Sequence, residues 1–176
     1  MRGRLTRLDA AGVRWVRSLP HPARLRGALV LLSRATDHSD AWLLAALAGA
    51  ALDRRRRERW LDAGSRVALV ELSSQAIKRV APRDRPQLRD LPALAPTPST
   101  RSFPSSHTAA AVAAIASFGG LLPDALLRSL AGVTAFSRLY LGVHFPSDVI
   151  AGAALGRALA PSRHRDSTYT DVRADS

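Results

Sequence analysis

The chain contains no cysteine among its 176 residues, and several other features are scarce. The absence of cysteine excludes disulfide bonds, thiolate metal sites and cysteine nucleophiles, and it leaves the cellular compartment open. Aromatic residues make up only 5% of the chain and do not alternate with the arginines. Because no helix-turn-helix, zinc-finger or RNA-recognition signature is present either, binding to nucleic acid is disfavoured. No uninterrupted apolar run reaches the ~18–20 residues of an ideal membrane span.

Acidic residues are scarce relative to basic ones, 14 against 26, which gives a net charge of +12. A chain this basic needs an anionic partner, and the headgroups of a membrane surface are the better candidate. The mean hydropathy of −0.03 is low for a protein with several membrane spans. Shorter apolar stretches nevertheless separate the charged clusters, at residues 41–52, 67–72, 108–122, 130–135 and 149–159.

Residues 4–19 have the pattern of an amphipathic helix. Leu8 and Trp15 share one face, and Arg7, Arg14 and Arg17 share the other. Such a helix can lie in the headgroup region of a bilayer, and a surface helix packed on a soluble core is the alternative. We therefore divide the chain into an interfacial helix (residues 1–20), a helical bundle (residues 21–161) and a disordered polar tail (residues 162–176).

The remaining periodicity predicts an all-α fold, a bundle of six short transmembrane helices that follow the amphipathic one. The expected ranges are residues 26–35, 41–52, 61–80, 106–122, 124–140 and 147–159. Between the third and fourth of these, residues 81–100 contain five prolines and are expected to form a long ordered loop.

Arginines 54–57 and 59 lie between apolar helices, which is typical of a cytoplasmic loop. Alternation through six helices then places the amino terminus on the same side as these arginines. Residues 78–107 and His144 are expected together on the opposite, extracytoplasmic side.

Reactive side chains occur in three separated blocks. The first block contains Lys78, near the end of the third predicted bundle helix, and Arg85, in the proline-rich loop. The other two contain Ser105, Ser106 and His107, then Arg138, His144 and Asp148. The second block directly precedes an alanine-rich helix, so it lies where unpaired backbone N–H groups and the helix dipole favour an anion. The pattern predicts a phosphate-binding site.

These blocks resemble the three-part signature of the type-2 phosphatidic acid phosphatase superfamily, and most closely its membrane lipid phosphatase branch. The matching motifs are Lys78-x6-Arg85-Pro86, Pro104-Ser105-Ser106-His107 and Ser137-Arg138-x5-His144-x3-Asp148. The superfamily also includes soluble acid phosphatases and vanadium haloperoxidases. One position departs from the family pattern, because the family usually has glycine where Ser106 stands.

The resemblance implies a role for each residue. His144 attacks phosphorus, Asp148 holds the other ring nitrogen of His144, and His107 protonates the leaving oxygen and then activates the water that hydrolyses the phosphohistidine. The resemblance further implies phosphate binding by Lys78, Arg85, Ser105, Ser106 and Arg138. Neither a metal nor a cofactor is expected.

Other polar residues are expected to have no catalytic role. We expect Arg79, Arg83, Arg89 and Arg101 to contact headgroups or the loop, and His38 and His164 to be surface residues. The turn Thr36-Asp37-His38-Ser39-Asp40 could suggest a metal site, but neighbouring residues in a turn converge poorly, so a solvated helix cap is expected.

Three functions are compatible with these observations. The first is a multi-pass membrane phosphatase that acts on a lipid phosphate, such as a polyprenyl diphosphate, phosphatidic acid or phosphatidylglycerol phosphate. The second is a soluble acid phosphatase or a vanadate-dependent haloperoxidase with the same site. The third is a non-enzymatic basic protein that binds membranes or nucleic acid. The expected partners of the first are the lipid substrate and membrane lipids, without nucleic acid, and the oligomeric state is left open.

Overall fold

The computed structural model describes residues 2–88, 90–97 and 99–161. The predicted tail at residues 162–176, with His164, lies outside the described residues. Arg89 also lies outside them. In the described part, the helices are α1 (Arg2–Arg17), α2 (Ala23–Ala35), α3 (Asp40–Leu52), α4 (Arg57–Val80), α5 (Ser106–Ser117), α6 (Asp124–Tyr140) and α7 (Pro146–Leu159). Short 3-10 turns, η1 (Asp37–Ser39) and η2 (Arg54–Arg56), precede α3 and α4.

The predicted all-α class is confirmed, since the described ranges contain helices and only isolated β-bridges. The helix expected at residues 106–122 ends earlier, at Ser117. It is followed by a turn in which Gly120 adopts φ +73°, a left-handed conformation that glycine adopts without strain. Among the described helices, none is both long enough and apolar enough to meet the criterion for a membrane span.

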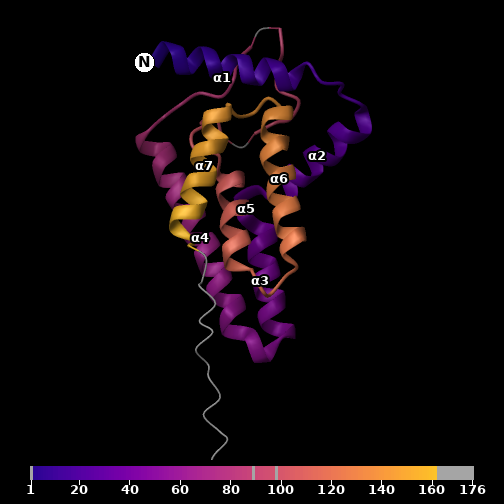
Figure 1. The fold of residues 1–176 in the computed structure, drawn as a ribbon, viewed down its shortest axis with the longest axis vertical. Helices are drawn as coiled ribbons and strands as arrows, with labels where there is room; N and C mark the ends of the chain where they lie inside the picture. Colours follow the sequence, from indigo (N-terminus) through magenta and orange to yellow (C-terminus); the bar gives the residue numbers. More distant parts are fainter. Residues whose placement is uncertain (1, 89, 98, 162–176) are drawn as a thin grey trace, which may run out of the picture.

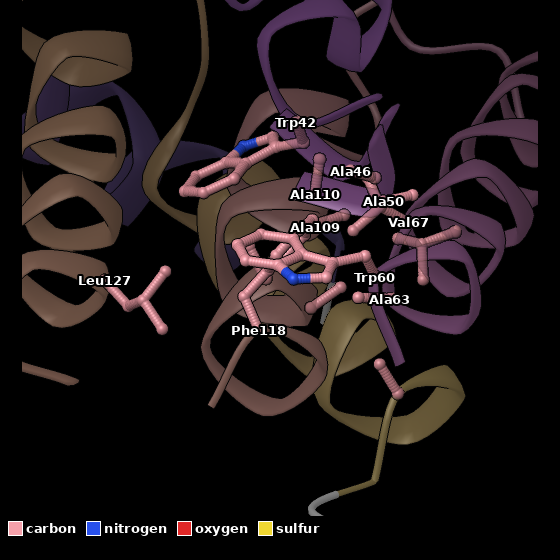
Figure 2. Packing of buried hydrophobic residues seen from close by; sticks show 14 residues of the cluster. Trp42, Ala46, Ala50, Trp60, Ala63, Val67, Ala109, Ala110, Phe118 and Leu127 are labelled. Carbon is pink, nitrogen blue, oxygen red and sulfur yellow. The ribbon is translucent and has the colours of Figure 1, made fainter. Parts of the chain in front are cut away.

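Helix α5 lies at the centre of the bundle and packs against α4, α6 and α7 (Figure 1). It can be surrounded because its inward residues are small: Ala109, Ala113 and Ala114 are fully buried. Larger side chains fill the core at the C-terminal end of α5. There the centroid of the Phe118 ring lies 5.7 Å from that of Trp42 and 5.9 Å from that of Trp60 (Figure 2). The centre of the bundle is thus held by close backbone packing and its far end by aromatic contacts.

Helices α3 to α7 alternate in direction between two ends of the bundle (Figure 1). At one end, Arg56 and Arg59 donate hydrogen bonds to the carbonyls of Gly120 and Gly119, next to the C-terminus of α5. The other end carries the N-termini of α5 and α7 and the C-termini of α4 and α6. This second end, which we call the site end, holds the residues of the three sequence blocks.

The amino-terminal helix crosses the site end, nearly perpendicular to α5, α6 and α7 (Figure 1). The backbone N–H of Ser147 donates to the carboxylate of Asp9 at 3.0 Å, and the Tyr140 hydroxyl donates to the carbonyl of Pro20 at 2.8 Å. The expected placement of the amino terminus beside the arginines of residues 54–59 is therefore wrong. Helix α2 begins near Tyr140 and ends near His107, so it does not cross the bundle as an alternating helix must.

Two glycines allow α7 to approach α5 closely. A Cβ at Gly156 would lie 2.2 Å from the carbonyl oxygen of Ala109, and one at Gly152 would lie 2.4 Å from that of Ser105. Both neighbours are backbone atoms of α5 or its cap, which cannot yield by rotating a side chain. The distance between these two helices therefore depends on the absence of side chains at both positions.

We predict that Gly156→Ala lowers the stability of the fold by about 1–3 kcal/mol, because the methyl group forces α7 away from α5. Gly132→Ala is the matched control, since Gly132 lies in α6 with nothing within 4 Å of its position for a Cβ. The control variant should be unchanged or gain up to about 1 kcal/mol from helix propensity. Thermal unfolding in detergent measures both, and equal melting temperatures for the two variants would contradict the prediction.

Candidate active site

A cavity of about 230 Å³ opens at the site end, between the proline-rich loop and the helix termini. Most of the predicted site residues line it: Lys78, Arg85, Ser106, His107, Arg138 and His144. These six residues come from α4, the loop, α5, α6 and the segment before α7. The structure therefore brings the three sequence blocks together around one space.

Two of the cations are held by backbone carbonyls. The Lys78 ammonium, at the end of α4, donates to the carbonyl of Pro104. In the loop, Arg85 donates through Nε to the carbonyl of Ser99 at 2.7 Å and through Nη1 to that of Val143 at 2.7 Å. Burial lowers the pKa of Arg85 to about 10, which leaves its guanidinium protonated at neutral pH. The carbonyl contacts fix both cations without neutralising them.

The third cation and one hydroxyl have unused hydrogen-bonding capacity. Arg138 is 2% exposed, and its Nη2 has no hydrogen-bond partner. The Oγ of Ser106, on the first residue of α5, is likewise buried without a partner. Leaving a buried donor unsatisfied costs free energy, so both groups are suited to an anionic ligand in the cavity.

Ser105 occupies a different position from the one its motif suggests. Its side chain accepts a hydrogen bond from the backbone N–H of Thr108 at 3.4 Å, which makes Ser105 the N-cap of α5. Ser105 is fully buried and is not among the cavity-lining residues. Its backbone N–H donates to the carbonyl of Asp148 at 3.0 Å. Ser105 thus joins α5 to α7 beneath the cavity, and direct phosphate binding by its hydroxyl stays a prediction.

His144 lies between a cation and a carboxylate and is 2% exposed. Its Nε2 is 3.2 Å from Nη1 of Arg85, and its Nδ1 is 3.6 Å from Oδ2 of Asp148. Because a guanidinium can only donate, the Arg85 contact requires a lone pair on Nε2 and places the ring proton on Nδ1, towards Asp148. Burial lowers the pKa of His144 to about 3, and the charges of Arg85 and Lys78 act in the same direction. The imidazole is therefore neutral at physiological pH.

His107 has a carboxylate partner that its sequence block does not contain. Its Nε2 lies 3.0 Å from Oδ1 of Asp37 and 3.2 Å from the carbonyl of Ser33. Both partners come from the α2–η1 region and line the same cavity. This arrangement leaves Nδ1 as the ring nitrogen that Asp37 and Ser33 do not engage.

The family model of the PAP2 superfamily matches residues 59–169 of this chain. The chain belongs to the PAP2 superfamily. Among curated proteins, it is 45% identical over 129 residues to decaprenylphosphoryl-5-phosphoribose phosphatase of Mycobacterium tuberculosis, with 71% of each chain covered. It is 40% identical over 135 residues to the protein of that name from Mycolicibacterium smegmatis, with 74% of this chain and 72% of the relative covered.

Two solved structures of PAP2 proteins share the fold. LpxE of Aquifex aeolicus superimposes with a TM-score of 0.71 and 25% identity, covering 87% of this chain and 92% of that chain. The transmembrane PAP2-type phosphatidylglycerolphosphate phosphatase of Bacillus subtilis superimposes with a TM-score of 0.72 and 22% identity, covering 89% and 82%. The resemblance to this superfamily, inferred from the motifs, is confirmed.

Ser106 needs no conformation that the usual PAP2 glycine would supply. It lies in the first turn of α5, and among the described non-glycine residues only Ser39 has a positive φ. The serine therefore adds a hydroxyl to the cavity without straining the backbone.

The turn between α2 and α3 is not the solvated cap that the sequence suggested. Asp37 contacts His107, and the buried hydroxyl of Ser39 donates to Glu71 at 3.0 Å. Glu71 also accepts a hydrogen bond from Gln75 at 2.7 Å, on the polar stripe of α4. The turn folds over α4 because α2 ends at the site end, and it gives the PAP2 cavity a wall of hydrogen-bonding groups.

Arg83 was expected to contact headgroups or the loop, and the structure places it elsewhere. It does not line the cavity, but it donates to Asp148 at 2.8 Å and to Asp9 at 2.6 Å. Arg79 and Arg101 are exposed. Arg83 differs from these two arginines in its contacts with Asp148 and Asp9, which are distant in the sequence.

We predict that unliganded protein loses stability between pH 7 and pH 5 in part because of His144. Its pKa is about 3 in the fold and near 6.5 when unfolded, so the unfolded chain binds a proton first as the pH falls. This term is small at pH 7 and amounts to something on the order of 2 kcal/mol at pH 5. His144→Gln should flatten this dependence. Melting curves from pH 5 to 8 in detergent measure it, and parallel wild-type and variant profiles would contradict it.

Proposed function

We propose that this chain is a PAP2-type phosphatase that hydrolyses a phosphate monoester of a membrane lipid through a phosphohistidine. One observation carries the proposal: a neutral His144 lies at a buried cavity that also holds two unpartnered donors, on Arg138 and Ser106. Phosphoryl transfer requires mainly positioning and charge neutralisation, and this cavity offers both.

The phosphate group binds among three cations and the N-terminus of α5. Arg138 and Arg85 contact its oxygens as planar forks, and Lys78 supplies a point charge. The Ser106 hydroxyl and the first backbone N–H groups of α5 complete the site. These contacts neutralise the charge that spreads over the equatorial oxygens in the transition state.

The first chemical step transfers the phosphoryl group to His144. The lone pair on Nε2 forms a bond to phosphorus while the bond from phosphorus to the lipid oxygen breaks. Asp148 stabilises the positive charge that develops on the ring, through the Nδ1 proton that faces it. His107 gives its Nδ1 proton to the leaving oxygen, and Asp37 holds the Nε2 proton of that imidazolium.

The second step returns the enzyme to its starting state. His107, now neutral, takes a proton from a water molecule as that water attacks phosphorus. The bond between phosphorus and Nε2 breaks, and inorganic phosphate leaves. Every neutralising role in this scheme belongs to a side chain or a backbone N–H group of the protein, so we propose a reaction that does not depend on a metal.

We propose a multi-pass membrane location, which exposed apolar side chains on the bundle support. They include Leu44, Leu47, Leu69, Leu72, Phe136 and Ile150, on α3, α4, α6 and α7. An apolar surface of this extent is costly in water and suits lipid. With the arginines of residues 54–59 on the cytoplasmic side, the cavity opens on the extracytoplasmic side. The alternation of α3 to α7 is compatible with five passes, fewer than the six predicted.

The lipid class follows from the relatives and from the cavity wall. The mycobacterial relatives are named for a phosphate on a ribose that is linked to a polyprenyl phosphate. Asp37, Glu71 and Gln75 give the cavity acceptors and donors that suit sugar hydroxyl groups. We therefore place a polyprenyl-linked sugar phosphate ahead of phosphatidic acid, phosphatidylglycerol phosphate and polyprenyl diphosphate.

A lipid panel with defined variants tests this function. Purified protein in detergent should release phosphate fastest from decaprenylphosphoryl-5-phosphoribose, and His144→Ala should lower kcat by roughly three orders of magnitude or more. His107→Ala should also lower kcat, because both steps lose the group that donates or accepts their proton. His21→Gln is a control, because His21 stacks on Tyr140 outside the cavity. Normal release by His144→Ala, or vanadate-dependent halide oxidation without phosphatase activity, would contradict the proposal.

Asp37→Asn should reveal the role of the carboxylate that faces His107. The variant removes the charge that stabilises the His107 imidazolium, so we expect kcat to fall about 10–100-fold with little change in KM. The alkaline limb of kcat should also move to lower pH, because the imidazolium loses its proton more easily. Steady-state kinetics from pH 5 to 9 measure both effects. A reduced kcat with an unmoved alkaline limb would limit Asp37 to a structural role.

A further inference from the structure

Asp9 is a buried carboxylate on the otherwise basic helix α1. It is 3% exposed, although α1 lies across the outside of the bundle. Its Oδ2 accepts hydrogen bonds from Nη2 of Arg83 at 2.6 Å and from the hydroxyl of Ser147 at 2.6 Å. Its Oδ1 accepts from the backbone N–H of Ser147 at 3.0 Å. The side chain thus makes three hydrogen bonds to segments that lie 74 and 138 residues further along the chain.

Arg83 connects this carboxylate to the one beside His144. While Nη2 binds Asp9, Nη1 donates to Oδ1 of Asp148 at 2.8 Å and to the Ser147 hydroxyl at 2.6 Å. The guanidinium also stacks on the Phe145 ring, 4.2 Å from its centroid. Its orientation is therefore set on two edges and one face, which leaves little freedom for Nη1 to move away from Asp148.

Asp148 depends on this guanidinium. It is fully buried, and its Oδ2 accepts from the Phe145 backbone N–H at 2.9 Å and faces Nδ1 of His144. Arg83 is the donor that the structure gives to Oδ1. Without it, a buried carboxylate loses both its cation and the contact that sets its rotation, and the cost is large. The plane in which Asp148 presents Oδ2 to His144 is thus set from outside the cavity.

We propose that Asp9 is a positioning residue for the phosphoryl-transfer reaction, acting through Arg83 on Asp148 and so on the ring of His144. This inference rests on the proposed function for its kinetic consequences. Asp9 touches neither the cavity nor His144. The Asp9 carboxylate shares the Arg83 charge with Asp148. Removing the Asp9 charge lets the guanidinium turn fully towards Asp148, and this shifts the Asp148 carboxylate away from the imidazole of His144.

A second ion pair between α1 and the loop provides a matched control. Arg14 of α1 binds Asp90, with Nη2 3.1 Å from Oδ1, but the two side chains are 49% and 57% exposed and contact no site residue. If Asp9 served only to dock α1 on the bundle, Arg14→Gln would have the same consequences as Asp9→Asn. If Asp9 positions Asp148, only Asp9→Asn and Arg83→Gln should affect the chemistry.

The kinetic test is a double-mutant cycle. Asp9→Asn should lower kcat about tenfold with KM within about twofold, and Arg83→Gln should lower kcat by about tenfold or more. In the Arg83→Gln background, Asp9→Asn should cost almost nothing further, because the connection is already broken. Arg14→Gln should keep the wild-type kcat. Additive effects of Asp9→Asn and Arg83→Gln, or an equal loss in Arg14→Gln, would overturn the proposal.

A spectroscopic readout separates this inference from the proposed function. The nitrogen-15 spectrum of labelled histidine in detergent reports which ring nitrogen carries the proton, and His144→Gln assigns the signal among the five histidines. Wild type and Arg14→Gln should show His144 protonated on Nδ1, while Asp9→Asn and Arg83→Gln should show mixed tautomers. If the wild-type protein releases phosphate from no lipid, the proposed function fails. The spectra still decide whether Asp9 positions the ring of His144. An unchanged His144 signal in Asp9→Asn would overturn the positioning role.

Discussion

Three cations around one cavity, two of them buried and the third half-buried, form the constraint on which the site depends. Lys78, Arg85 and Arg138 repel one another in surroundings that screen charge poorly. Carbonyl oxygens accept from the first two, and the imidazole of His144 is the other contact of Arg85. Such an arrangement costs folding free energy until an anion enters the cavity. The same desolvation and positive field keep His144 unprotonated, which a nitrogen nucleophile requires. In the proposed function, phosphate affinity and a reactive imidazole thus arise from one physical cause.

Packing at the centre of the bundle fixes the geometry that this field requires. The cavity-lining residues Ser106 and His107 begin α5, while Asp148 lies in the first turn of α7. The two helices approach closely because Gly152 and Gly156 face backbone carbonyls, and the Ser105 N–H donates to the Asp148 carbonyl. A change in the spacing of these helices would move His107, the proposed acid–base residue, relative to Asp148, which is proposed to hold the nucleophile. In the proposed mechanism, close packing of small residues therefore serves catalytic alignment as well as stability.

The sequence predicted what local pattern and motif spacing encode, and it missed what only tertiary contact creates. The all-α class, most of the helix ranges and the residues of the three motifs follow from periodicity and a known spacing, whereas the end of α5 at Ser117 does not. Asp37, Asp9 and Arg83 gave no comparable signal, because each gains its role from a partner between 65 and 74 positions away. Ser105 was open to a better prediction, since a serine before an alanine-rich helix is a common N-cap. The position of α1 at the site end depends on the buried Asp9, which charge counting along the chain cannot anticipate.

In the proposed membrane location, the position of α1 links the membrane surface to the chemistry. Leu8 and Trp15 are 63% and 71% exposed on this helix, so they can insert at headgroup depth beside the cavity. A lipid phosphate lies at that depth, where the cations of the cavity can reach it while the tail stays in the bilayer. Asp9 is on the same helix, and the guanidinium that binds it also binds Asp148. In the proposed membrane location, α1 is thereby joined to the carboxylate behind the proposed nucleophile, and a displacement of α1 at the membrane surface would be transmitted through Arg83 to His144.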